Sequence, residues 1–184
     1  LRLSAVGLSI PQTIAISLSV MIGAIAFSGS MVACLKLHGV LTKNSLTFRG
    51  RKLLALVVLG SMFLAMFLLP HYGNFVLYCL IVASLLLGLL LVMPIGGADM
   101  PVVIALLNSY SGMAAAITGF VLVQSNIYIA ITLIICGSLV GASGFILTRI
   151  MCKALNRSLY NIMFSQVVVH QDSAASAVLG HVST

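Results

Sequence analysis

Long apolar stretches, separated by short polar or basic segments, dominate this chain. A helix that crosses the hydrocarbon core of a bilayer needs about 20 largely apolar residues, and about 17 suffice. The run from Leu85 to Leu91 does not alternate polar and apolar positions, as the strands of a membrane barrel would. Backbone groups in lipid must be paired within the segment, which leaves helices. The pattern therefore predicts an all-α fold, a polytopic membrane helix bundle of five transmembrane helices.

Prolines and polar turns set the expected helix ends. Pro11 and Pro101 precede or open apolar runs, as proline does in a first helical turn. Pro70 and Pro94 are expected to end the second and third helices, because proline has no N–H to donate. The five helices are expected at residues 13–37, 53–69, 75–93, 101–122 and 127–152.

Three segments follow from these limits. Residues 1–12 are expected to be an N-terminal extension, 13–157 the transmembrane domain, and 158–184 a loose C-terminal tail. The chain begins with leucine rather than methionine, and nothing resembling a signal peptide precedes the first span. We therefore expect a fragment, a processed product or one part of a split subunit.

Composition excludes a soluble domain. The chain of 184 residues is 61% hydrophobic and 6% charged, whereas soluble domains are about a quarter charged. The net charge of +7 would raise the question of nucleic acid, but the nine basic residues flank apolar segments instead of gathering into a surface. No nucleic-acid partner is expected, and the bilayer is the environment.

The basic residues also predict an orientation. Eight of the nine lie in two places, a basic loop from Lys36 to Lys52 and the segment from Arg149 to Arg157. Five spans put both places on one side of the membrane, which the positive-inside rule assigns to the cytoplasm or matrix. The carboxyl end is expected on that side. On this reading no His, Glu or Lys lies at hydrocarbon depth.

Asp99 is the only formal charge between Lys52 and Arg149. It stands in the turn Gly96–Pro101, just before the proline that opens the fourth helix, where its carboxylate could cap orphan N–H groups. Acids in or near a membrane are rare and costly, so a functional carboxylate is the other reading. The residues alone leave both open.

The fourth helix carries a polar and small stripe near mid-membrane. By helical spacing, Asn108, Ser111 and Gly112 share one face. Such a stripe can hold helices together by close approach and hydrogen bonds. It can equally line a file of water, because helix packing alone does not require an asparagine at this depth.

Small residues on the fifth and first helices predict close packing. Gly137, Gly141 and Gly144 carry a GxxxG spacing, which lets helix backbones approach. Packing is the default reading, with Ser30 and Ser143 the best candidates to line a cavity. The cysteines have neither CxxC nor paired-histidine spacing, so no metal site is expected.

Two long motifs carry a specific resemblance. The run Ile95–Val103, followed by Leu107–Gly112, closely resembles the membrane domain of the beta subunit of proton-translocating NAD(P) transhydrogenase. The runs Leu139–Gly144 and Ile150–Ser158 resemble the same domain. The resemblance covers residues 13–162 and corresponds to the C-terminal five helices of that domain.

The resemblance implies a proton-conducting bundle that couples proton passage to hydride transfer from NADH to NADP. Asn108, Ser30, Ser111 and Ser143 would line the proton path, and the glycines Gly112, Gly137, Gly141 and Gly144 would allow close packing. Asp99 and Arg157 would communicate with the NADP(H)-binding domain. No catalytic residue is expected in this chain, because hydride transfer would take place in soluble domains.

The resemblance also implies partners and a location. The chain itself is expected to bind no cofactor, while NADP and NAD bind elsewhere in the assembled complex. Expected partners are other transhydrogenase membrane helices, including a histidine-bearing helix, and the NADP(H)- and NAD(H)-binding domains. The complex is expected to be dimeric and to reside in a bacterial cytoplasmic membrane or the mitochondrial inner membrane. The alternative is a non-enzymatic channel or transporter subunit, or an assembly scaffold.

Overall fold

Helices make up every regular element in the part of the chain that the structure describes. The computed structural model describes residues 10–40, 50–72, 74–156 and 158–164, and the predicted all-α class is confirmed there. The elements are α1 (Ile10–Leu37), α2 (Arg51–Tyr72), α3 (Asn74–Val92), the 3-10 turn η2 (Gly97–Asp99), α4 (Met100–Leu122), α5 (Ile127–Ala154) and α6 (Leu159–Phe164).

Four of the described helices are long and apolar enough to cross a membrane. They are α1, α3, α4 together with η2, and α5. The apolar part of α2, Leu53–Leu69, is shorter. The structure thus supports an integral membrane protein, and the fifth span stays a prediction.

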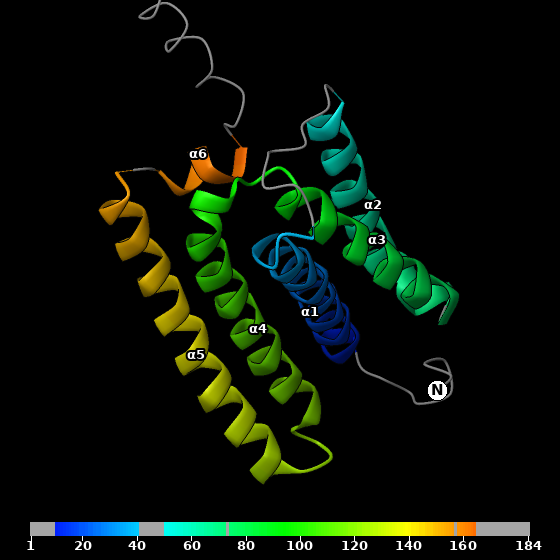
Figure 1. Ribbon diagram of the computed structural model, residues 1–184. Coiled ribbons are helices and arrows are strands. Elements are labelled where there is room, and N and C mark those ends of the chain that lie inside the picture. Colours follow the sequence, from blue (N-terminus) through cyan, green and yellow to red (C-terminus); the bar gives the residue numbers. More distant parts are fainter. Residues whose placement is uncertain (1–9, 41–49, 73, 157, 165–184) are drawn as a thin grey trace, which may run out of the picture.

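The helices stand in a row in which each packs against the next. Going across the row, α5 packs on α4, α4 on α1, α1 on α3, and α3 on α2 (Figure 1). The ends of α1 and α3 and the beginning of α4 lie at the same end of the bundle as α6 (Figure 1). Large apolar side chains are exposed along all five long helices, which suits a surface that faces lipid.

The main buried cluster lies at the α6 end of the bundle. It joins residues from α1, α3, the α3–α4 turn, α4, α5 and α6. These are Val32, Ala33, Val92, Ile95, Met100, Val102, Val103, Leu107, Cys152 and Ile162. The cluster holds the α3–α4 turn against the ends of the neighbouring helices.

Two helix ends differ from the sequence-based expectation. The second helix does not stop at Pro70 but continues to Tyr72. Because Pro70 stands in the last turn, it removes a single backbone hydrogen bond and the helix ends two residues later. The segment expected to be loose from residue 158 begins with α6, which buries Ile162 in the end cluster. Residues 1–9 and 165–184, most of the expected extension and tail, lie outside the described residues.

Candidate functional site

Glycines bring the backbones of α4 and α5 together. A methyl group placed on Gly137 would lie 2.5 Å from the amide nitrogen of Ala116 and 2.6 Å from the carbonyl oxygen of Gly112. One on Gly144 would lie 2.9 Å from the amide nitrogen of Ser109. Gly141 is also buried at this contact but has more room, with 3.5 Å to the nearest backbone nitrogen, that of Met113. The predicted small-residue positions thus lie at the α4–α5 interface.

A hydrogen bond between helices reinforces this contact. The hydroxyl of the buried Ser109 donates to the carbonyl oxygen of Gly141 at 2.7 Å. Sequence reasoning missed this bond, because Ser109 lies next to Asn108 in the chain and its direction depends on how α4 is rotated. The bond joins α4 to α5 in a lipid environment, where water rarely competes for the hydrogen-bonding groups.

We expect the Ser109→Ala variant to lower the free energy of unfolding by about 0.6–2 kcal/mol, the range measured for such bonds between membrane helices. Ser138→Ala is the matched control, since the exposed Ser138 hydroxyl donates only within its own helix, to Ile134. Thermal unfolding of the two variants in detergent measures the difference. Equal stabilities would show that the Ser109 bond contributes nothing.

Asn108 lies on the outside of the bundle, between the contacts that α4 makes with α1 and α5. Its side chain is exposed, and no hydrogen bond to it occurs among the described residues. It follows the start of α4 by eight residues, about 12 Å along the helix. A carboxamide at that depth is costly in lipid unless water or another polar group meets it.

Ser111 extends the polar surface of α4 toward α1. It is exposed, lies one turn beyond Asn108, and its hydroxyl donates to the carbonyl oxygen of Leu107 at 3.0 Å. Leu107 packs against Gly29 of α1, while Tyr110 packs against the end cluster. Asn108 and Ser111 are exposed, and α4 makes its main helix contacts with α1 and α5 rather than with α3.

Ser30 approaches the same surface from α1. Gly29 packs against Leu107, which puts Ser30 at the depth of Leu107 and Asn108. Ser28 and Ser30 flank Gly29 on opposite sides, and Ser28 faces α3. The exposed Ser30 therefore lies on the side of α1 away from α3. We call Ser30, Asn108 and Ser111 the α1–α4 polar face.

Ser143 does not belong to this face. It is exposed on α5, and its hydroxyl donates to Val140 of its own helix at 3.1 Å. The α4 contact of α5 is made by Gly137, Gly141 and Gly144, and Ser143 points to the other side of the helix. Three of the four predicted proton-path residues thus lie exposed on the neighbouring helices α1 and α4, and the fourth, Ser143, lies exposed on α5.

Asp99 is buried in η2 at the beginning of α4, with 5% of its surface exposed. Its carboxylate makes no capping hydrogen bond to α4, so the capping interpretation is wrong. The reason is its helical backbone, with φ −93° and ψ −2°, whereas a capping residue is extended. Asn126 has that extended backbone and accepts hydrogen bonds from the amides of Tyr128 and Ile129. Arg157 lies outside the described residues.

Two further polar contacts connect α1 to its neighbours. The hydroxyls of Ser19 and Thr118 lie 2.5 Å apart between α1 and α4. Lys36, expected where the first helix meets the basic loop and outside the membrane, lies in the last turn of α1 but is buried. Its ammonium group donates to the carbonyl oxygens of Met93 and Ile95. Spacing could not reveal either contact, because both depend on which helices are neighbours.

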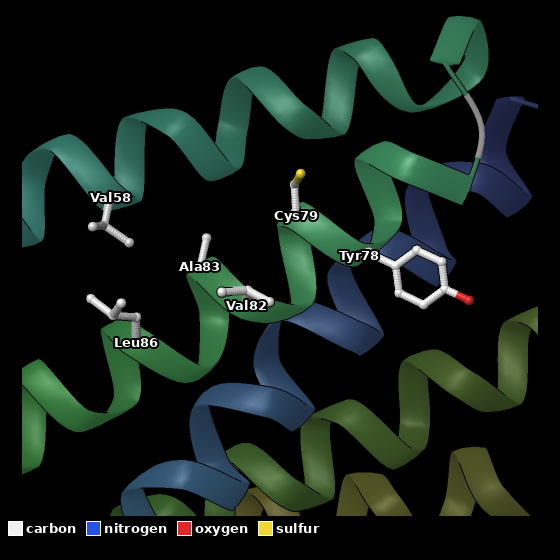
Figure 2. Close-up of a pocket in the computed structure, with 6 residues that line it drawn as sticks. All are labelled: Val58, Tyr78, Cys79, Val82, Ala83 and Leu86. Atoms are coloured by element: carbon white, nitrogen blue, oxygen red, sulfur yellow. The ribbon is translucent and has the colours of Figure 1, made fainter.

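A shallow groove of about 450 Å³ runs between α2 and α3. Figure 2 shows Val58 on α2 facing Cys79, Ala83 and Leu86 of α3, with Val82 nearby and the ring of Tyr78 turned away from α2. The surface of the groove is almost entirely apolar, which suits contact with lipid or another apolar helix better than passage of a proton. The α1–α4 polar face is the better candidate site.

Comparison with known proteins gives the chain a family. A family model described as "NAD(P) transhydrogenase beta subunit" matches residues 4–182, nearly the whole chain. The chain belongs to this family. The resemblance in the sequence motifs is thereby confirmed. Two Rhodospirillum rubrum proteins named "NAD(P) transhydrogenase subunit beta" are each 43% identical to it over 148 residues.

The match covers 80% of this chain but 31% of each relative. The chain thus spans about a third of the length of these transhydrogenase beta subunits. It corresponds to membrane-spanning helices, in agreement with the four apolar helices of the structure.

Proposed function

We propose that this chain supplies part of the proton path of an NAD(P) transhydrogenase. Proton passage would be coupled to hydride transfer from NADH to NADP in nucleotide-binding domains outside this chain. NADP and NAD would bind in those domains, so the chain would act as part of a translocating oxidoreductase. The family and the exposed carboxamide of Asn108 at mid-membrane depth support this proposal.

The α1–α4 polar face would be one wall of the path. Its three polar side chains lie on the outside of this bundle, where lipid would otherwise meet them. A further membrane helix, bearing the histidine that the resemblance implies, would cover the face and supply the titratable group. Water held between the helices would then connect the carboxamide of Asn108 to that histidine. Ser143 would line the path only where another helix reaches the far side of α5.

Contact with the NADP(H)-binding domain would lie at the α6 end of the bundle. Asp99 ends η2 and directly precedes α4, which begins at that end of the bundle. The resemblance implies that Arg157 takes part in the same contact. The C-terminal ends of α1 and α5 carry basic residues in their last turns, Lys36 and Lys153. By the positive-inside rule this end would face the cytoplasm of a bacterium or the matrix of a mitochondrion. The assembled complex would be a dimer.

Purification of the chain from its native membrane tests the proposal. We expect NAD(H)- and NADP(H)-binding domains to co-purify, and the preparation to transfer hydride from NADH to NADP. A homo-oligomer that conducts ions and carries no nucleotide-binding partner would overturn the proposal in favour of a channel subunit.

A further inference from the structure

Lys36 is buried although it stands next to the end of its helix. Its side chain has 1% of its surface exposed, and α1 ends at Leu37. A lysine so close to a helix end can ordinarily extend its ammonium group into water. Burial of an ammonium group is costly unless hydrogen bonds compensate for the lost hydration.

The compensation comes from the turn that follows α3. The ammonium group of Lys36 donates to the carbonyl oxygen of Ile95 at 3.0 Å and also to that of Met93. Carbonyl groups at the end of a helix lack partners within the helix, and the end carries partial negative charge. Both acceptors follow the last residue of α3, Val92, so Lys36 binds the backbone of the turn after that helix end from a different helix.

The same turn leads directly to Asp99. Within the turn, the amide of Ile95 donates to Val92 at 3.1 Å and the amide of Asp99 donates to Gly96 at 3.1 Å. Ile95 is completely buried in the end cluster. With Ile95 fixed by Lys36 and by the cluster, the position of Asp99 relative to α1 is fixed as well.

Lys36 also shares a helix with the α1–α4 polar face. It follows Ser30 by six residues, about 9 Å along α1. An intact helix transmits an axial displacement over that distance. A shift of α1 at the polar face would therefore act on the α3–α4 turn through the two hydrogen bonds of Lys36.

We propose that Lys36 is a positioning residue that ties α1 to the α3–α4 turn, so that movement at the proton path displaces Asp99. This inference rests on the proposed function. It makes α1 the mechanical connection between the membrane path and the end of the bundle that would meet the NADP(H)-binding domain. The ammonium group positions the turn and carries no proton in this role.

The test compares Lys36→Met with Lys36→Arg in the assembled complex, reconstituted into vesicles. The readout is the factor by which an imposed proton gradient stimulates hydride transfer, a ratio that does not depend on the amount of folded complex. We expect Lys36→Met to reduce this factor at least about fivefold, the lower end of typical coupling between sites. Lys36→Arg should retain most of it, and the KM values for both nucleotides should not change.

Ser138→Met is the control for the introduced methionine, because the exposed Ser138 lies in the middle of α5, away from the α6 end, and its hydroxyl donates within its own helix. If the proton gradient stimulates hydride transfer in Lys36→Met by the same factor as in the wild type, even with less folded complex, the inference is overturned. Lys36 would then be a purely structural residue. If Lys36→Met does not assemble, Lys36→Gln replaces it with the same expectation, because the shorter neutral side chain cannot span both carbonyl groups.

Asn108→Leu, measured alongside, separates this inference from the proposed function. Loss of stimulation in Asn108→Leu with full stimulation in Lys36→Met would refute the role of Lys36 alone. A wild-type complex without any response to the gradient would refute both.

Discussion

Replacement of Asn108 with leucine is expected to lower proton-coupled hydride transfer in the assembled complex roughly tenfold or more. Asn108 presents the only carboxamide on the α1–α4 polar face, and leucine can neither donate nor accept a hydrogen bond. An unsatisfied polar group costs about 1–3 kcal/mol, and each 1.4 kcal/mol in a barrier is a factor of ten in rate. Proton uptake into vesicles, followed during NADP reduction by NADH, measures the effect.

Two control variants make the result specific. Asn108→Gln keeps the carboxamide and should retain part of the coupled rate. Ser138→Leu also places leucine at an exposed polar position in the middle of a helix, but on α5, away from the polar face. We expect it to pump protons at the wild-type rate. Full pumping by Asn108→Leu would remove the main support for the proposed path.

The second large effect is expected at Gly137. A methyl group there would come within 2.6 Å of backbone atoms on α4, at Ala116 and Gly112, and backbone atoms cannot move aside as a flexible side chain can. Gly137→Ala should therefore separate α4 from α5 and cost about 1–3 kcal/mol or more, as overpacking does. The melting temperature in detergent should fall clearly.

Gly60→Ala is the matched control for Gly137→Ala. It adds the same methyl group on α2, at a position with no atom within 4 Å, and it replaces glycine in a helix by a better helix former. Its melting temperature should equal or exceed that of the wild-type chain. A Gly137→Ala variant as stable as Gly60→Ala would mean that α4 and α5 do not pack in this way.

Apolar runs, prolines and glycine spacing predicted most of the helical arrangement, because in a membrane these features depend on short-range constraints. Runs long enough to cross the bilayer must be helical, and Gly137 and Gly144 could be assigned to an interface without knowledge of the partner helix. The exposed polar residues on α4 could also be identified from the sequence alone. An asparagine in the middle of an apolar helix is costly in lipid, whichever helices surround it.

The features that sequence reasoning missed depend on neighbours in space. Lys36 was assigned to a basic loop because a lysine near a helix end ordinarily reaches water, and only the end of α3 beside it explains its burial. Asp99 was given a possible capping role from its place before Pro101, but η2 gives it a helical backbone that prevents the capping bond. The short helix α6 was not predicted, because a segment of six residues is too short to show helical periodicity.

The central claim is that Asn108 lines a hydrated path covered by another helix of the assembly. The most direct measurement is the reaction of the Asn108→Cys variant with a water-soluble maleimide in the assembled complex, with the native cysteines replaced. Met113→Cys is the reference, since the exposed Met113 lies five residues away and about 140° around α4. The account predicts that the Asn108→Cys variant reacts and the Met113→Cys variant does not. Equal reactivity of the two variants, or none in either, would contradict it.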